Sequence, residues 1–286
     1  MIHTLPKGLV TVIRKVFYLL PTRFRFLARR IYYFPIDLID GVLGRRHKYQ
    51  PRKGKIFIGS GDFIKLGKGH LSKLILLTGL KPNHNVLDIG SGIGRTALPL
   101  TEFLDKEAAY EGFDVTKEGI EWCNNKIHRD FPNFSFTYVN LGNDLYNNSM
   151  NTAANYKFPY TSNRFDVSFL FSVFTHMQPD EVFNYLKEIE RTLVIGGRCL
   201  ATFFTYDDQT EQKILNNELD LNFPFEMGNY RLMSKNVISA NVAFKNEFLL
   251  RMIDESNLKV ENVIDGFWKT ISTDDNEYQD IYILRK

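Results

Sequence analysis

The sequence predicts an α/β protein with a doubly wound, mainly parallel sheet of seven strands and an N-terminal helical extension. Three observations carry this prediction. Strand-like and helix-like segments alternate from Lys81 onward, a glycine-rich turn follows the first of these strands, and the first 53 residues differ in charge from the rest. The chain of 286 residues is 44% hydrophobic and 24% charged, a composition typical of globular proteins.

The elements follow from hydrophobic periodicity. After a connection over residues 44–70 and a helix over residues 70–80, the expected strands cover residues 85–90, 108–115, 134–140, 164–172, 198–205, 258–268 and 279–286. The expected helices cover residues 93–105, 117–129, 179–193 and 244–253. Pro179 fits the first turn of its helix, and Gly196 and Gly197 fit its end. Residues 141–163 and 206–243 have no period and predict a surface excursion and an irregular insertion.

The N-terminal segment is strongly basic. Residues 1–53 hold 12 Lys and Arg against 2 acids, whereas the remainder is net negative, so the net charge of +3 conceals an asymmetry. Apolar residues recur at helical spacing among the basic ones, as in Phe24, Leu27 and Ile31. This pattern is typical of a helix pair that packs on the main domain with a solvated arginine face. The functional alternatives are contact with an anionic membrane surface through residues 9–34 and nucleic-acid binding.

Cys123 and Cys199 show neither metal-ligand spacing nor a disulfide framework, so no metal site is expected. Arg14 and Lys15 interrupt the first apolar stretch, which therefore does not resemble a secretion signal. No run approaches the roughly 20 apolar residues of a membrane-spanning helix. We expect a cytoplasmic protein, at the inner face of the membrane if the basic segment binds lipid.

The glycine turn differs from a dinucleotide-binding fingerprint. In VLDIGSGIGRTALPL the glycines stand two apart, at Gly90, Gly92 and Gly94, and Arg95 occupies the place of the third glycine of G-x-G-x-x-G. Asp88 lies at the end of the preceding strand, where a carboxylate would repel a pyrophosphate. A ligand with an ammonium or sulfonium charge would fit better.

Polar residues end the next two strands. Asp114 lies 24 residues after Gly90, where a carboxylate can bind the two hydroxyls of a ribose. Asn140 and Leu141 end the following strand, where a side-chain amide can contact an adenine edge. Together these residues describe an adenosine without phosphates and with a cationic tail, and S-adenosylmethionine matches that description.

Four segments resemble, in order, the motifs of class I S-adenosylmethionine-dependent methyltransferases, and most closely the bacterial general methyltransferase-domain group. They are NVLDIGSGIGRTALPL, YEGFDVTKEGIEWC, FDVSFLFSVFTHM and LKEIERTLVIGGRCLATFF. The resemblance implies a Rossmann-like methyltransferase fold and a division into a helical extension (1–55) and a methyltransferase domain (56–286). Within that domain, residues 81–205 form the cofactor half, and residues 206–286 form a cap insertion and closing strands.

The resemblance also implies the roles of single residues. Asp88 and Gly90 would contact the methionine amino group, Gly92 and Gly94 would shape the turn, and Asp114 would hold the ribose, with Val115 on the adenine. Ser91 replaces a frequent cysteine, and Asn140, followed by Leu141, replaces a frequent aspartate. The cofactor-binding residues so predicted are Asp88, Gly90, Ser91, Gly92, Gly94, Asp114, Val115, Asn140 and Leu141.

The predicted reaction is methyl transfer to a hydroxyl or carboxyl of a small-molecule, sugar or lipid-linked acceptor. Positioning supplies most of the acceleration when the methyl group is already activated. His176, in SVFTHM, is the candidate base, and its alternative role is packing beside the cofactor pocket. Tyr206, Asp207, Tyr230 and Trp268 lie in segments that could cap the acceptor.

Three other functions remain open. RNA methylation would use the basic segment, although the stretch SVFT (172–175) replaces the asparagine-proline-proline-aromatic motif of many amino-methylating nucleic-acid enzymes. A non-catalytic binding protein could retain the same fold. A nicotinamide oxidoreductase is the rival enzyme class, and the missing third glycine argues against it.

Overall fold

The computed structural model describes residues 22–59, 61–146, 149–270 and 277–286. The chain divides into two compact units, Met1–Gly61 and Asp62–Lys286. The part of the predicted amphipathic segment that covers residues 9–21 lies outside the described residues. The first unit contains helix α2 (Thr22–Val42) and the short 3-10 helix η2 (Lys53–Lys55). The described residues contain no helix that is long and apolar enough to cross a membrane.

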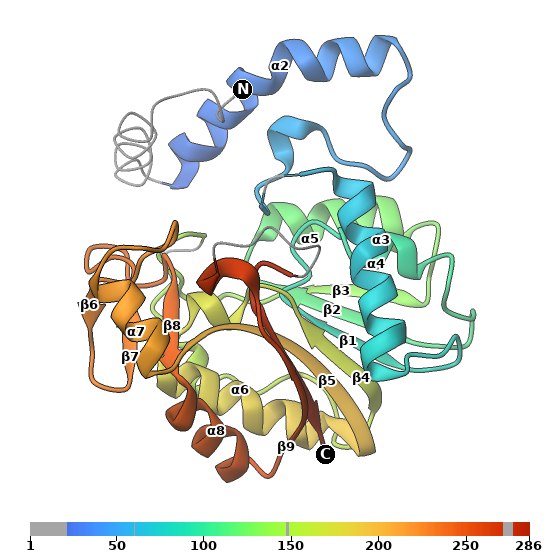
Figure 1. Ribbon diagram of the computed structural model, residues 1–286. Coiled ribbons are helices and arrows are strands. Elements are labelled where there is room, and N and C mark those ends of the chain that lie inside the picture. Colours follow the sequence, from blue (N-terminus) through green and yellow to red (C-terminus); the bar gives the residue numbers. More distant parts are fainter. Residues whose placement is uncertain (1–21, 60, 147–148, 271–276) are drawn as a thin grey trace. The chain divides into compact units, whose positions relative to one another are not determined.

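The second unit is built on a twisted sheet (Figure 1). Its strands are β1 (Val86–Ile89), β2 (Tyr110–Asp114), β3 (Phe134–Tyr138), β4 (Phe165–Leu170), β5 (Leu193–Tyr206), β6 (Phe225–Glu226), β7 (Tyr230–Leu232), β8 (Val242–Lys245), β9 (Lys259–Ile264) and β10 (Asp280–Arg285). In the described residues the strand order is β3-β2-β1-β4-β5-β8-β7-β6, with β10 on β5 and β9 on β10. Strands β1 to β5 pair in parallel, and β10 pairs antiparallel with β5.

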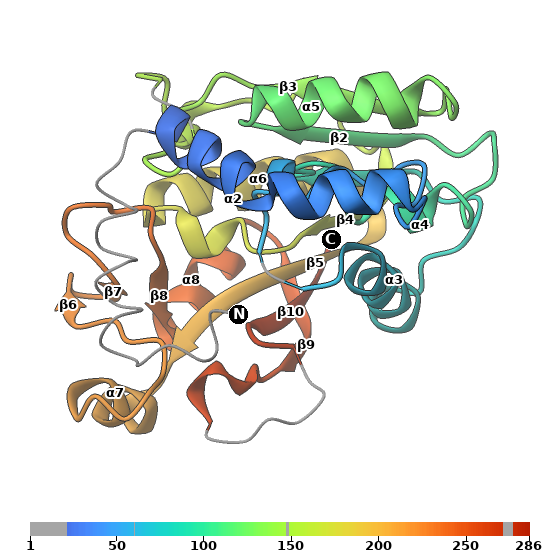
Figure 2. The same cartoon turned by 90° about the horizontal axis from the view of Figure 1, so that it is seen from above.

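The predicted fold class is confirmed, because β3-β2-β1-β4-β5-β10-β9 form the expected, mainly parallel seven-stranded part. The insertion predicted to be irregular adds three further strands, β6 to β8, and helix α7 (Asp208–Leu215). The last residues of β5 extend past β4 and pair with β8, so β5 ends beside β8 and α7 (Figure 2).

Helices cover both faces of this sheet. They are α3 (Phe63–Lys73), which continues into η3 (Leu74–Thr78); α4 (Ala97–Leu100); α5 (Lys117–Cys123), which continues into η4 (Asn124–His128); α6 (Pro179–Thr192); and α8 (Asn246–Glu255). Residues of α6 and α8 share one apolar cluster with one face of the sheet, and residues of η3, α4, α5 and η4 share a second cluster with the other face. Figure 1 shows the same two layers. Strand β1 is buried along its whole length, as expected of a central parallel strand.

Two helix predictions were wrong at their boundaries. Helix α3 begins at Phe63, not near His70, because the Asp62 side chain accepts a hydrogen bond from the Lys65 amide at 2.7 Å and caps the helix. The helix predicted over residues 93–105 is reduced to one helical segment, Ala97–Leu100. Positive φ angles at Gly92 and Gly94 hold the chain in a turn before it.

The paired glycines do not end α6. The helix ends at Thr192, and β5 starts at Leu193 and continues through both glycines. Gly196 has a φ of +82° within the strand, and the pairing of β4 with β5 shifts between Phe165 and Val167. The glycines therefore accommodate a strand irregularity, which a sequence pattern does not distinguish from a helix end.

Candidate functional site

The carboxyl ends of the parallel strands meet at one edge of the sheet, and this edge carries the candidate site. Gly90 and Ser91 both donate main-chain hydrogen bonds to the Phe113 carbonyl, at 2.9 and 3.0 Å, so the turn after β1 lies against the end of β2. The Val139 amide donates to the Asp114 carbonyl at 3.0 Å and brings the end of β3 to the same place. Ligands of open α/β sheets bind at this edge.

The glycine turn is left-handed at all three glycines, with φ angles of +82°, +58° and +78° at Gly90, Gly92 and Gly94. A Cβ atom on Gly90 would lie 2.4 Å from Cγ2 of Val173, which is the third residue after the end of β4. A Cβ atom on Gly94 would lie 2.6 Å from Cδ1 of Ile127. Both glycines thus serve close packing, one against the end of β4 and the other against η4.

Gly119 is a further requirement of this turn. A Cβ atom there would lie 2.2 Å from the Gly92 carbonyl oxygen, so α5 can lie against the turn only because this position has no side chain. Sequence reasoning missed this residue. A glycine in the first turn of a predicted helix, where its low helix propensity is a disadvantage, was the available signal.

Asp114 binds the turn through its carboxylate. The Gly92 amide donates to Oδ2 at 2.8 Å, and the Thr116 amide donates to Oδ1 at 2.7 Å. Burial raises the pKa of this carboxyl, and the hydrogen bonds from Thr116 and Gly92 oppose that rise. Asp114 therefore fixes the turn while it lies at the sheet edge, and the predicted ribose contact stays a prediction.

Asp88 is directed into the protein. Its carboxyl is buried, and the Tyr110 hydroxyl donates a hydrogen bond to it. Burial raises the pKa of Asp88 from 3.8 to about 8, the bond from Tyr110 lowers it, and the charge of Asp114 raises it further. At neutral pH the protonated form of Asp88 is therefore well populated. Tyr110, from the start of β2, is a second residue that sequence reasoning missed.

The remaining predicted cofactor residues lie along the same edge. Asn140 is exposed, and its Oδ1 accepts a hydrogen bond from the Tyr138 hydroxyl at 3.1 Å. Leu141 is buried and Val115 is partly buried, both in the apolar cluster on the α6 side. Ser91 is buried beside Gly112, and its Oγ has no hydrogen-bond partner among the described residues. Their predicted contacts with a ligand stay predictions.

His176 ends η6 (Phe174–His176), directly after the segment that packs on Gly90. Its Nδ1 lies 2.8 Å from the Ser239 carbonyl oxygen. Because a carbonyl only accepts, Nδ1 carries the proton, and Nε2 is left with a lone pair. Burial lowers the pKa of His176. The histidine is thus a neutral imidazole whose tautomer is fixed by the insertion, through a main-chain group that no sequence pattern reveals.

Ser172 is the first exposed residue after β4 and has a left-handed backbone, with a φ of +59°. Its amide donates to Thr202 Oγ1 at 2.8 Å, and its hydroxyl lies 2.9 Å from Gln279 Oε1. A left-handed backbone conformation costs free energy in a non-glycine residue, and such residues cluster at functional sites. The turn at Ser172 directs Val173 onto Gly90.

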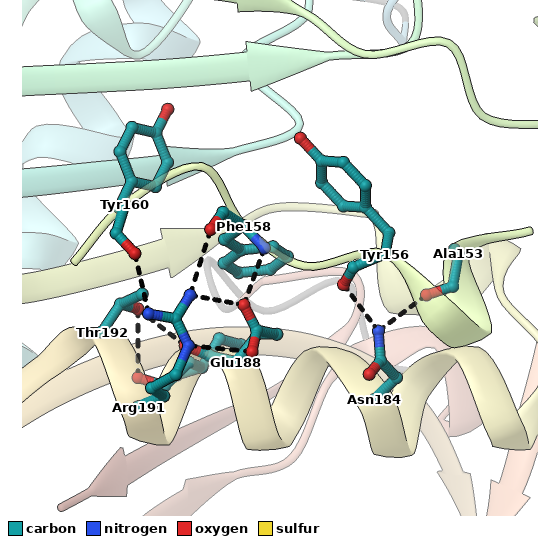
Figure 3. A network of polar contacts seen from close by, with 9 residues as sticks. Ala153, Tyr156, Phe158, Tyr160, Asn184, Glu188, Arg191 and Thr192 are labelled. Atoms are coloured by element: carbon teal, nitrogen blue, oxygen red, sulfur yellow. Dashed lines mark hydrogen bonds and ion pairs between the residues drawn. The ribbon is translucent and has the colours of Figure 1, made fainter. Parts of the chain in front are cut away.

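The segment between β3 and β4 is only partly the surface excursion that was predicted. Ala153, Phe158 and Tyr160 are buried in the cluster on the α6 side. Figure 3 shows how α6 holds the main chain of this segment. The Asn184 side chain donates hydrogen bonds to the carbonyls of Ala153 and Tyr156 at 2.8 and 2.9 Å. We refer to Asn184, Glu188 and Arg191 as the α6 clamp.

The rest of the α6 clamp binds the following turn of that segment. Glu188 accepts from the Phe158 amide at 2.7 Å, and Arg191 donates to the carbonyls of Tyr160 and Phe158 at 2.7 and 3.1 Å (Figure 3). Arg191 also pairs with Glu188 at 2.5 Å. The clamped segment packs on Phe113, one residue before Asp114, through a ring contact of Phe158 at 4.9 Å.

The residues expected to cap the acceptor make contacts within the protein, and their predicted role at the acceptor stays a prediction. Tyr206 and Trp268 are buried in a third apolar cluster beneath the insertion. Asp207 caps α7 by accepting from the Thr210 amide at 2.8 Å, a bond that lowers its pKa. The ring of Tyr230 stacks on that of Phe244, with 6.4 Å between the ring centroids. None of these contacts involves the glycine turn.

A polar hollow of about 450 Å³ lies beside the segment after β3, with Asp144 and Glu181 in its lining. Both carboxylates accept main-chain hydrogen bonds, from the Ile238 amide at 3.0 Å and from the Gln178 amide at 2.9 Å. Across the described ranges, no group of three His, Cys, Asp or Glu side chains could hold a metal ion.

The strand order and the glycine turn at the carboxyl edge define a Rossmann-like nucleotide-binding fold. The family model described as "Methyltransferase domain" matches residues 87–201. This range contains the glycine turn, Asp114 and His176. This match assigns residues 87–201 to a methyltransferase domain, and S-adenosylmethionine is the cofactor that this family implies.

Solved structures share the fold at low sequence identity. A protein from Pyrococcus horikoshii OT3 is 13% identical over 81% of this chain and 94% of its own, with a TM-score of 0.53. A protein from Bacillus halodurans C-125 that is assigned as a methyltransferase is 16% identical over 76% and 99%, with a TM-score of 0.51. The [4+2]-cyclase SpnF is 15% identical over 91% and 95%, with a TM-score of 0.53.

Proposed function

We propose that this methyltransferase acts on a hydroxyl or carboxyl of a small-molecule, sugar or lipid-linked acceptor. The observation that carries the proposed site is the hydrogen bond of 2.8 Å from the Gly92 amide to Asp114, which joins the glycine turn to the end of β2. It brings a close-packed turn and a carboxylate to the edge where open α/β sheets bind ligands.

The donor set at this edge fits S-adenosylmethionine. Asp114 offers a carboxylate to ribose hydroxyls, Asn140 offers an amide to an adenine edge, and Val115 and Leu141 offer apolar surface to the ring. The Asp88 carboxyl accepts a hydrogen bond from the Tyr110 hydroxyl. We therefore assign Asp88 the role of keeping the turn polar near the methionine end of the cofactor. When bound, the cofactor supplies a methyl group that its sulfonium charge activates.

His176 is the proposed base. Its Nδ1–H bond to the Ser239 carbonyl leaves Nε2 as the proton acceptor, and its lowered pKa keeps the ring neutral and able to accept a proton from a hydroxyl. A carboxyl acceptor ionises in water and needs no base. His176 would then only pack beside the cofactor pocket, so the effect of a His176→Gln variant on methyl transfer separates the two acceptor types.

The partner surface is proposed to be an anionic membrane at the inner face of the cell. The basic, aromatic-rich N-terminal unit supports this choice over a soluble acceptor met in bulk water. The RNA alternative rests on the same positive charge. SpnF shares the fold and is named a cyclase, so the fold alone does not determine the reaction.

Calorimetry and labelled methyl transfer test this function together. We expect S-adenosylmethionine and its demethylated product to bind and NAD not to bind. Asp114→Asn should weaken cofactor binding at least about tenfold, as expected for loss of a charge-assisted contact. Asp166→Asn is the matched control, because Asp166 accepts from the Asn85 amide at 2.8 Å near the start of β4, at the opposite edge of the sheet.

Transfer of labelled methyl groups into fractionated cell extract identifies the acceptor. Label in lipid, sugar or soluble metabolites that depends on Asp114 supports the proposal. Label in RNA would replace it with the RNA alternative, and cofactor binding without any transfer would favour a non-catalytic binding protein. Binding of NAD in place of S-adenosylmethionine would refute the cofactor assignment.

A further inference from the structure

Helix α2 carries its apolar residues on the side that its own unit does not use. Phe24, Leu27, Ile31, Phe34, Leu38 and Val42 follow one another at intervals of three and four residues, which places them in one row along the helix. Each is between 49% and 79% exposed. We call these six residues the apolar row. A helix that folds on its neighbours normally buries such a row, so this arrangement needs an explanation.

The opposite side of α2 makes the contacts within the unit. Asp37 accepts hydrogen bonds from the amides of Lys53 and Gly54 at 2.6 and 2.9 Å, and Asp40 pairs with the Lys53 ammonium at 3.0 Å. A Cβ atom on Gly54 would lie 3.0 Å from Cα of Arg30, so η2 approaches the helix main chain closely. The polar side of α2 is therefore bound to η2, and the apolar row is directed away from it.

The charge of the same unit selects an anionic partner. Between Thr22 and Ile58 there are ten Lys and Arg residues against two acids, Asp37 and Asp40. Both acids are engaged with Lys53 or the main chain beside it. An outward apolar row on a positively charged helix is the pattern that binds anionic bilayers in the interfacial plane. Arg29, Asp37 and Asp40 lie within the helix and would oppose its burial across the bilayer.

We propose that α2 docks on an anionic lipid bilayer, with the apolar row inserted between the lipids and the neighbouring Arg and Lys side chains at the lipid phosphates. The inference deepens the proposed function and rests on it only for the purpose of docking, which is to bring the active site to a lipid-linked acceptor. Lipid binding itself does not require methyl transfer.

The test uses the full-length protein and vesicle flotation. We expect wild type to float with vesicles of phosphatidylcholine and phosphatidylserine, and more weakly with phosphatidylcholine alone. The double variant Leu27→Asp, Ile31→Asp should lose at least about tenfold in partition, because two apolar side chains no longer insert between the lipids and the added negative charges are repelled by the anionic surface. Ile195→Asp is the matched control. Ile195 is 87% exposed in the second unit, Asp62–Lys286, which we call the methyltransferase unit, and its substitution should leave flotation unchanged.

Other partners give different results, each of which overturns the proposal. If the apolar row packs on the methyltransferase unit, wild type does not float and the double variant lowers the melting temperature. If it joins a second copy, light scattering shows a wild-type dimer that the variant dissociates. Salt-sensitive binding of RNA without flotation would assign the charge to nucleic acid. Calorimetry with S-adenosylmethionine on the same samples keeps failure of docking distinct from failure of the proposed function.

Discussion

Asp88 shows how burial couples one carboxyl of the site to pH. Its pKa rises from 3.8 to about 8 because the carboxyl is buried. The folded state therefore holds this proton more tightly than the unfolded state does. The resulting stabilisation is fully present below about pH 4 and is lost as pH rises through about 8, by up to about 1.4 kcal/mol per pH unit.

We predict that Asp88→Asn flattens the decline of stability between pH 5 and about 8, because asparagine keeps the acceptor for Tyr110 and does not ionise. Urea unfolding across this range measures it. Tyr110→Phe should act in the opposite sense, since the Tyr110 bond lowers the pKa of Asp88 and its removal extends the protonated range upward. Parallel stability curves for wild type and Asp88→Asn would contradict the assignment.

A second prediction concerns a glycine that lies against a main-chain oxygen. Gly119→Ala places Cβ 2.2 Å from the Gly92 carbonyl, so α5 or the turn must move. We expect a loss of roughly 2 kcal/mol in unfolding free energy and weaker cofactor binding. Gly69→Ala is the control in α3. A Cβ atom added at Gly69 would have no atom within 4 Å beyond its own helix main chain, so this variant should stabilise the protein by up to about 1 kcal/mol. Equal effects of the two variants would refute the packing argument.

At the scale of elements, the α6 clamp makes a third prediction. Arg191→Met removes donors to the Phe158 and Tyr160 carbonyls and leaves Glu188 without its ion pair. We expect a cost of about 2–3 kcal/mol in urea unfolding, because buried main-chain acceptors lose a charged partner. Arg251→Met, at an exposed position of α8, should change stability by less than about 0.5 kcal/mol. A comparable loss in both variants would mean that the clamp contributes nothing specific.

The elements that the sequence predicted well are those with a strong local pattern. β1 to β5, α5 and α6 have apolar periods that burial on one or both sides explains. The strands β6 to β8 were not predicted, since they are short and are stabilised by pairing with the distant end of β5. The start of β5 was not predicted either, because Gly196 and Gly197 are also typical of a helix end.

The candidate site was predictable to the same extent. Gly90, Gly92, Asp114 and Asn140 were expected at one edge because they follow strands and parallel strands end at one edge, and they lie there. Their contacts with a ligand stay predictions. The partners of these residues were not found. Tyr110 reaches Asp88 from another strand, and Ser239 binds His176 through its main-chain carbonyl, which any residue would supply.

At the scale of the whole molecule, the division after Gly61 predicts that the methyltransferase unit folds and binds its cofactor without the N-terminal unit. The three apolar clusters of the described residues contain nothing before Leu71, and all described strands lie in Asp62–Lys286. We expect a chain that starts at Asp62 to unfold cooperatively and to bind S-adenosylmethionine within about threefold of the full-length affinity, a difference below 1 kcal/mol. Circular dichroism and calorimetry measure both properties, and the same chain should no longer float with anionic vesicles. A truncated chain that folds but does not bind the cofactor would place part of the cofactor site in the N-terminal unit.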